Sequence, residues 1–231
     1  MILCPFDKLP KDFQNNDVKI FYDKLKHKKT NLILKKTFDI LLSFLLIILF
    51  LPLFLIISIV VKLTSKGRIF YLQERVTTYK KTFKIIKFRT MIENADKMGS
   101  LVTVNNDARI TKVGAFLRKT RLDEIPQLFN ILKGEMSFVG ARPEVPKYVD
   151  KYSDQMKSTL LMPAGVTSLA SINFKDEDKL LNNAENIDET YINKILPEKM
   201  KYNLEYIEKF NLIYDFKIMF KTVFAVVKNN A

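Results

Sequence analysis

The longest uncharged run in the sequence extends from Ile40 to Val61 and contains 22 residues, most of them Leu, Ile, Phe or Val. About 20 such residues are enough to cross the hydrocarbon core of a bilayer as a helix. The run lies too far from the N-terminus, and is too long, to be a cleaved signal peptide. A buried core helix is the alternative, but a soluble helix of this length usually keeps a polar face. The run therefore predicts a helix embedded in a membrane.

Basic residues crowd both flanks of this run. They are Lys19, Lys24, Lys26, Lys28, Lys29, Lys35 and Lys36 before it, and Lys62, Lys66, Arg68, Arg75, Lys80 and Lys81 after it. Because basic flanks stay on the cytoplasmic side, a simple crossing would leave one flank on the wrong side. Pro52 lacks an N–H and clashes with the preceding turn, so it kinks a helix. The charge pattern favours a re-entrant helix broken at Pro52 over a spanning helix that tolerates the proline.

The apolar run divides the chain into three predicted parts. Residues 1–34 are basic, carry scattered aromatics such as Phe13, Phe21 and Tyr22, and are predicted to lie on the membrane surface. Residues 35–62 form the re-entrant membrane helix. Residues 63–231 contain no repeat and no long flexible linker, so they are predicted to form one cytoplasmic catalytic domain.

The predicted fold class is a helix-rich α+β structure with one short β-hairpin and surface amphipathic helices. Strand-like alternation at 69–76 and 83–88 predicts the hairpin. Helices are predicted at 110–120, from an Asp123 N-cap to Gly134, at 147–161, and through EKMKYNLEYIEKF. The last stretch, DFKIMFKTVFAVVK, has an apolar stripe that suits either a core or a membrane contact: Phe216, Met219, Phe220, Val223 and Val227.

Composition narrows the chemistry. The formal net charge of +13 suits an anionic partner such as nucleic acid, lipid headgroups or phosphorylated metabolites. The charge is densest beside the apolar run and no basic-aromatic recognition strand is evident, which argues against nucleic acid. A single cysteine, Cys4, and a single histidine, His27, exclude an intrachain disulfide and a Cys/His zinc site. His27 lies in the lysine run KLKHKK, which is more typical of a solvated histidine than of a catalytic base.

The segment LRKTRLDEIPQLFN is the strongest local candidate for a catalytic site. Asp123 and Glu124 are adjacent carboxylates that follow three basic residues. Neighbours on a helix diverge by about 100°, so the two acids would divide labour. One would attack or accept a proton while the other holds a metal. The alternative is an ordinary helix cap, with Asp at the N-cap and Glu in the first turn.

Other basic residues are candidates for binding phosphate. Arg142 lies on a turn between Gly140 and Pro143, and a fixed guanidinium suits bidentate phosphate recognition, although a solvated surface arginine is the alternative. Lys87 and Arg89 occupy alternate positions of a predicted strand and would face the same side. They could bind phosphate or pair with carboxylates.

Together these segments resemble the bacterial sugar transferase family, the monotopic phosphoglycosyl transferases. The resemblance covers roughly residues 35–228. It is carried by KKTFDILLS before the proline-broken run, SKGRIFYLQERV, FKIIKFRTM, DARITKVGAFLRKTRLDEIPQLFNILKGEMSFVGARPE, PAGVTSLAS and DFKIMFKTV.

The resemblance implies a monotopic protein of the bacterial inner membrane with its active site on the cytoplasmic face. It implies a UDP-sugar donor, a polyprenyl phosphate acceptor and Mg²⁺ as cofactor. Asp123 and Glu124 would be the catalytic dyad and the metal ligands, with Asp123 attacking the sugar-linked phosphorus and Glu124 helping to position the metal. Arg118, Arg142, Lys87 and Arg89 would bind phosphate.

Two alternatives stay open. A non-catalytic, membrane-tethered protein that binds anionic lipid or a partner protein would explain the charge and the anchor, but not the dyad beside clustered arginines. A direct attack by the lipid phosphate would need no covalent intermediate. The sequence also leaves open which sugar is transferred, which glycan is built, and whether the chain forms a homodimer.

Overall fold

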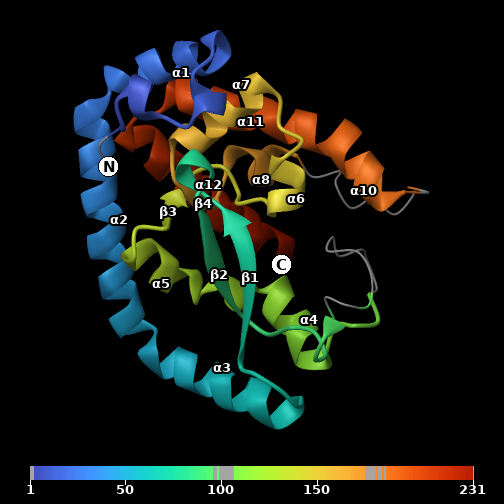
Figure 1. The fold of residues 1–231 in the computed structure, drawn as a ribbon. Helices are drawn as coiled ribbons and strands as arrows, with labels where there is room; N and C mark the ends of the chain where they lie inside the picture. The colour runs from blue at the N-terminus through green and yellow to red at the C-terminus, as the bar shows by residue number, and fades with distance from the viewer. Residues whose placement is uncertain are drawn as a thin grey trace.

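The computed structural model describes residues 3–95, 98, 107–174, 180–181, 184 and 186–230, with side chains described up to residue 225. Helices dominate, and the strands form two small two-stranded sheets (Figure 1). The helix-rich α+β class predicted from the sequence is confirmed. A long bent helix pair runs along one side of the molecule, and the remaining elements fill its concave side (Figure 1).

The bent pair consists of α2 (Lys29–Leu49) and α3 (Leu51–Thr64), which meet at Phe50 with a bend of 63°. Pro52 lies in the first turn of α3 and has no N–H to give to the carbonyl four residues earlier, so the helix breaks just before it. The predicted proline break is confirmed, and α2 begins six residues before the expected start at Lys35. Neither helix alone has the length and apolar character of a membrane span in the described residues, whereas the bent pair together has both.

The two faces of the bent pair differ sharply. The inner face packs on the domain and buries polar residues of α2, namely Lys35, Asp39 and Ser43, together with Phe54, Ile57 and Val61 of α3. The outer face exposes large apolar side chains: Leu41, Phe44, Leu45, Ile48, Leu49, Leu55, Ile56 and Ile59. A contiguous exposed apolar surface of this kind is uncommon on soluble monomers and marks an interaction surface.

A buried ionic network fastens α2 to the domain. Lys35 Nζ lies 2.6 Å from Asp215 Oδ2, and both side chains are almost fully buried. The Tyr206 hydroxyl donates to Asp215 Oδ1 at 2.8 Å. One turn along α2, Asp39 Oδ1 accepts the Phe138 N–H at 3.3 Å. The network therefore joins α2 to α11 (Leu196–Lys209), α12 (Leu212–Asn230) and β3 (Met136–Val139).

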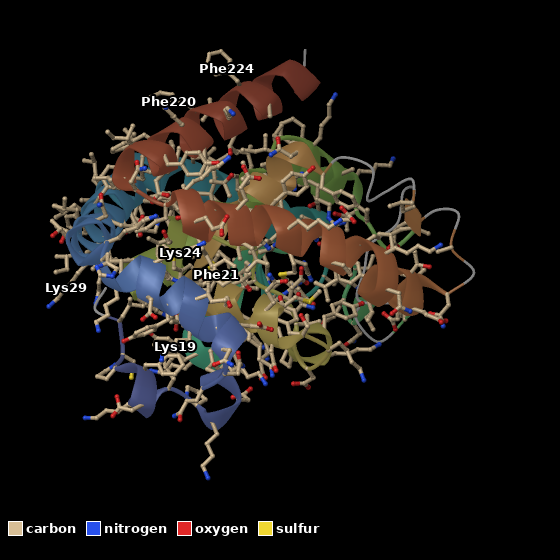
Figure 2. All side chains as sticks on the ribbon, turned by 90° about the horizontal axis from the view of Figure 1, so that it is seen from above. Lys19, Phe21, Lys24, Lys29, Phe220 and Phe224 are labelled. Atoms are coloured by element: carbon tan, nitrogen blue, oxygen red, sulfur yellow. The ribbon has the colours of Figure 1, made fainter. Side chains whose placement is uncertain are left out.

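The N-terminal residues pack into the main core. They form the 3₁₀ turns η1 (Phe6–Lys8) and η2 (Lys11–Phe13), followed by α1 (Asn16–Lys26). Phe13, Phe21 and Tyr22, expected from the sequence to face a membrane surface, are buried beside α11 and α7 (Asp154–Lys157). Figure 2 labels Lys19, Phe21 and Lys24 at α1, with Lys29 of α2 to one side. The division of the chain after residue 34 stays a prediction.

The predicted hairpin is confirmed. Strands β1 (Phe70–Val76) and β2 (Thr82–Phe88) pair antiparallel, with Phe70 opposite Phe88 and Val76 opposite Thr82, across the turn η3 (Thr78–Lys80). A second, parallel pair joins β3 to β4 (Ala164–Thr167). The sequence did not predict this pair, because four-residue strands are too short to show an alternating pattern.

The helices of the domain confirm some expectations and correct others. The predicted helices at 110–120 and through EKMKYNLEYIEKF are α4 (Lys112–Lys119) and α11. The single helix expected over 147–161 is wrong. The Ser153 side chain caps α7 there, and the segment divides into α6 (Pro146–Val149), α7 and η6 (Ser158–Leu161). The other elements are α8 (Leu169–Asn173), α10 (Ile187–Thr190) and the π-helical turn η7 (Tyr191–Ile195).

The apolar stripe of α12 is split between core and surface. Phe216 and Met219 are half-buried, but Phe220 and Val223 are exposed. Phe224 is exposed as well, and Figure 2 shows it with Phe220 on the outer side of α12. Val227, the last member of the expected stripe, lies outside the residues whose side chains are described.

Candidate active site

Asp123 and Glu124 lie on a short 3₁₀ turn, η5 (Leu122–Glu124), between α4 and α5 (Gln127–Leu132). Asp123 is therefore not the helix N-cap predicted from the sequence. Arg121 precedes the turn in the left-handed conformation, with φ of 59°. A non-glycine residue in this conformation costs about 1–2 kcal/mol and often marks a functional turn. It reverses the chain after α4 and places both carboxylates, each buried, against the hairpin.

Two cations hold Glu124. Lys87 Nζ donates to Glu124 Oε1 at 2.8 Å, and the Arg142 guanidinium donates to both carboxylate oxygens. Burial alone would raise the pKa of Glu124, but Arg142 and Lys87 together hold that pKa well below its usual range. Glu124 therefore stays ionised at any pH at which the protein would work. The same carboxylate raises the pKa of Arg142, so the pair is charged throughout.

The pKa of Asp123 is shifted in the opposite direction to that of Glu124. Burial and the neighbouring charge of Glu124 raise the pKa of Asp123, while Lys87, Arg118 and Arg142 oppose the rise. Its Oδ1 is fully buried and has no hydrogen-bond partner in the described part of the chain. A buried polar atom without a partner is unusual and calls for an explanation such as a catalytic role or an unseen ion. Asp123 thus offers an uncommitted carboxylate oxygen within a ring of cations.

Arg118 completes the basic surroundings of the dyad. Its Nε donates to the Thr90 hydroxyl at 2.8 Å, which fixes the guanidinium at the end of β2. Burial lowers the pKa of Arg118, and the charge of Asp123 opposes this change. Thr90 was not singled out from the sequence, and only its nearness to Lys87 along the chain could have pointed to it.

Arg89 is used elsewhere. Its guanidinium donates to the Ser65 carbonyl at 2.8 Å, to the Ser65 hydroxyl at 2.7 Å, and to the Lys66 carbonyl, so it caps the end of α3. Lys87 and Arg89, expected on one face, have different partners: Lys87 donates to Glu124, whereas Arg89 donates to the end of α3. Of the four predicted basic residues, the structure brings Lys87, Arg118 and Arg142 to the dyad.

The residues of the dyad fit a magnesium ion. No group of three or more Asp, Glu, His or Cys side chains that could hold a metal occurs among the described residues. Mg²⁺ does not need one, because it is commonly held by one or two carboxylates together with substrate phosphates and water. Asp123 and Glu124 would each supply one carboxylate to the ion.

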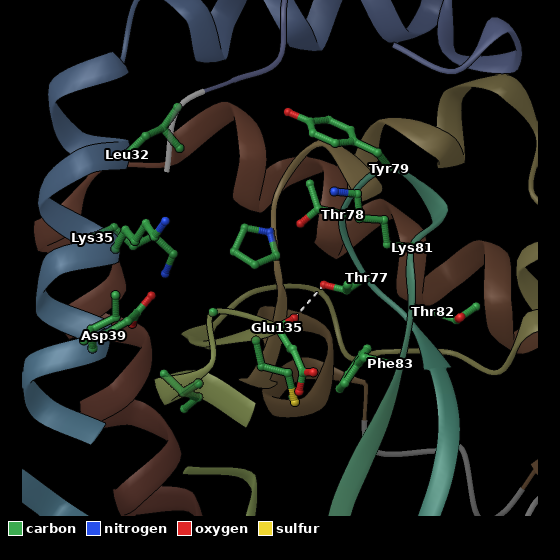
Figure 3. Close-up of a pocket in the computed structure, with 16 residues that line it drawn as sticks. Leu32, Lys35, Asp39, Thr77, Thr78, Tyr79, Lys81, Thr82, Phe83 and Glu135 are labelled. Carbon is green, nitrogen blue, oxygen red and sulfur yellow. Dashed lines mark hydrogen bonds between the residues drawn. The ribbon is translucent and has the colours of Figure 1, made fainter. Parts of the chain in front are cut away.

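A separate cavity of about 290 Å³ lies at the other end of the hairpin. It is lined by α2, by the hairpin turn and by the segment around Glu135, and Figure 3 shows Lys35, Asp39, Thr77 and Phe83 around it. Phe83 precedes Lys87 by four residues on β2, so the two lie about 13 Å apart along the strand. Neither dyad residue lines this cavity.

Known proteins resemble this chain over most of its length. The family model described as bacterial sugar transferase matches residues 30–229. A UDP-glucose:undecaprenyl-phosphate glucose-1-phosphate transferase from Klebsiella pneumoniae is 38% identical over 200 residues, covering 84% of this chain and 40% of that protein. The exopolysaccharide production protein ExoY of Sinorhizobium fredii is 34% identical over 207 residues, covering 83% of this chain and 84% of that protein.

A third relative, a UDP-N-acetylgalactosamine-undecaprenyl-phosphate N-acetylgalactosaminephosphotransferase from Aeromonas hydrophila, is 34% identical over 197 residues. The match covers 84% of this chain and 44% of that protein. The chain thus spans less than half the length of some curated relatives, and most of the length of others. The matched region includes the bent helix pair and the whole dyad site.

Proposed function

The chain belongs to the bacterial sugar transferase family, and we propose that it transfers a sugar 1-phosphate from a UDP-sugar to a polyprenyl phosphate, with release of UMP. The observation that carries the proposal is the buried Asp123, whose Oδ1 has no partner within the described residues although three cations surround it. Relatives act on different UDP-sugars, so the sugar is left open.

The first step is nucleophilic. A carboxylate oxygen of Asp123 attacks the phosphorus that carries the sugar, and the bond from that phosphorus to the oxygen it shares with UMP breaks. UMP leaves with the electron pair, and the phosphosugar remains on Asp123 as an acyl phosphate. Burial, and the lack of a hydrogen bond from any described residue, leave Asp123 Oδ1 poorly solvated, which favours attack.

In the second step, the polyprenyl phosphate replaces Asp123. A phosphate oxygen of the lipid attacks the same phosphorus, and the bond from phosphorus to Asp123 breaks. The carboxylate is regenerated, and the product is a polyprenyl diphosphate sugar. Because the same side chain is acceptor in one step and leaving group in the other, no histidine is needed.

The basic residues stabilise the charge on the phosphate oxygens. Arg118, which precedes the dyad in the sequence, and Arg142, which follows it, each supply a guanidinium group. Lys87 adds a positive charge from the hairpin. Glu124 keeps Lys87 and Arg142 in place before the donor arrives. When bound by Asp123 and Glu124, Mg²⁺ would supply Lewis-acid neutralisation of the diphosphate.

The bent helix pair suits a membrane anchor at the cytoplasmic face of the bacterial inner membrane. Its 63° bend at Phe50 would let it enter and leave the bilayer on one face, and its exposed apolar side would contact lipid. The buried network of Lys35 and Asp215 would hold this anchor against the domain. The dyad, on the domain side of the pair, would then meet a lipid phosphate at the bilayer surface.

The proposed reaction is tested by its products and its metal requirement. The full chain in detergent, given Mg²⁺, polyprenyl phosphate and a panel of UDP-sugars, should release UMP from at least one of them. A chelator should abolish release, and excess Mg²⁺ should restore it. A non-catalytic tethered protein would release no UMP from any donor, yet would bind lipid equally well with or without chelator.

The pH dependence of the rate should report the raised pKa of Asp123. The nucleophile must be ionised, so activity falls as the pH drops through its pKa, and this fall should occur above the ordinary range of an aspartate. Arg118→Gln removes a charge that lowers this pKa, so the acid limb of its residual activity should move to higher pH. Lys119→Gln, the exposed neighbour, is the matched control. Identical acid limbs in the two variants would contradict the assignment.

A further inference from the structure

The loop that carries Arg142 is fixed at both ends. At its start, the Gly165 N–H donates to the Ala141 carbonyl at 2.8 Å, and a Cβ on Gly165 would overlap the Gly140 backbone. At its end, the Val76 N–H donates to the Glu144 carbonyl at 2.9 Å. Arg142 therefore projects from a short segment whose backbone is tied to both small sheets.

A second set of contacts holds the loop from the side of β1. Arg75 Nη1 donates to the Pro143 carbonyl at 2.9 Å. The Gln73 side chain accepts from Arg75 Nε and Nη2 at 3.0 and 2.6 Å, so this guanidinium is itself held in one orientation. The residue next to Arg142 along the chain is thus anchored by a side chain that is already oriented.

The Glu144 side chain is held from the opposite direction. Its buried Oε1 accepts the Tyr191 hydroxyl at 2.7 Å, and Lys199 Nζ lies 3.6 Å away. Lys199 also donates to the Tyr191 oxygen at 2.9 Å. The Tyr191 ring packs on Tyr148 with centroids 4.6 Å apart. Glu144 is therefore fixed by the π-helical turn η7 and by α11, elements that contribute no residue to the dyad.

The position of Glu144 matters because it lies two residues from Arg142 and interacts with its charge. A free Glu144 carboxylate would compete with Glu124 for the Arg142 guanidinium, because the charge of Glu144 also acts on this cation. Tyr191 and Lys199 hold Glu144 where Arg142 remains paired with Glu124.

We infer that Tyr191 and Glu144 are positioning residues that set the orientation of Arg142 toward Glu124 and the donor phosphates. The inference rests on the proposed function of the dyad, but it concerns Glu144 and Tyr191, which lie 20 and 67 residues after Glu124 in the sequence. Loss of a residue that orients a metal ligand commonly costs about 10-fold to 100-fold in activity, and we expect the lower end of that range for a residue that orients Arg142.

Tyr191→Phe is the sharpest variant, because it removes the hydroxyl and keeps the ring on Tyr148. It should lower kcat/KM about tenfold. Tyr202→Phe on α11 also removes a tyrosine hydroxyl, one that has no hydrogen bond to a described residue, and should leave kcat/KM unchanged. Arg142→Lys keeps the positive charge but loses the planar guanidinium that donates two parallel hydrogen bonds. In this background, Tyr191→Phe should change kcat/KM by less than about twofold.

A hydroxyl that merely stabilised the fold would give the same fold-change in both backgrounds, and that additive result would overturn the inference. Hydrogen exchange provides a readout that does not need activity. The amides of Arg142, Glu144 and Val145 should exchange faster in Tyr191→Phe than in Tyr202→Phe, and equal rates would also overturn the inference. If the unaltered chain releases no UMP, the proposed function fails, while the exchange comparison still decides whether Tyr191 holds the loop.

Discussion

Replacing Asp123 by Asn should abolish the transfer of the sugar phosphate, lowering the rate of UMP release by about 10⁴-fold or more. The amide keeps the size of the side chain but cannot attack phosphorus. Burial of Asp123 and its place beside Arg118, Lys87 and Arg142 are the physical basis for this expectation. Asp123→Ala should be equally inactive, and it excludes recovery of activity by deamidation of the asparagine.

The covalent step has a signature of its own. With donor alone and no lipid acceptor, the unaltered chain should exchange labelled UMP into the UDP-sugar, and a peptide containing Asp123 should gain the mass of a phosphosugar. Neither should occur in Asp123→Asn. Asp150→Asn is a matched control, because Asp150 is exposed and lies at the end of α6, outside the dyad. Turnover that needs both substrates, without exchange or adduct, would favour direct attack by the lipid phosphate.

Replacing Lys35 by Met should destabilise the protein by about 3–5 kcal/mol, because it removes the only cation paired with the buried Asp215 among the described residues. Asp39, one turn away and also buried, would lose the same charge. Tyr206 would remain as the hydrogen-bond donor to Asp215, but a hydroxyl does not neutralise a carboxylate. The loss is measured as the change in unfolding free energy of the full chain in detergent.

Lys36→Met is the matched control for this experiment. Lys36 is the next residue on α2 and is exposed, so its replacement should change the unfolding free energy by less than about 0.5 kcal/mol. Lys35→Met/Asp215→Leu should recover part of the loss, because apolar replacement of both partners of a buried ion pair is often nearly neutral, while Asp39 still lacks the charge of Lys35. Equal stability of the two single variants would show that the Lys35–Asp215 pair does not fasten α2 to the domain.

Local sequence signals predicted those elements that are made by neighbouring residues. The apolar run with Pro52 predicted the broken helix, since a missing N–H acts within one turn. Alternation predicted β1 and β2, and the period of apolar residues predicted α4 and α11. The same signals placed Asp123 at a helix N-cap, because they could not foresee the left-handed Arg121 and the 3₁₀ turn that follows it.

In the candidate site, too, the sequence predicted the residues and the tertiary structure decided how they pair. The sequence by itself identified candidate residues from their types and from their neighbours along the chain: Asp123, Glu124, Lys87, Arg118 and Arg142. Only the tertiary structure decided that Lys87 and Arg142 share Glu124, that Arg89 caps α3 instead, and that Asp123 keeps one oxygen without a described partner. It also decided that Phe13 and Phe21 belong to the core. Periodicity reports which side of an element is apolar, whereas ionic pairing and burial depend on segments brought together from distant parts of the chain, and no local pattern encodes those distances.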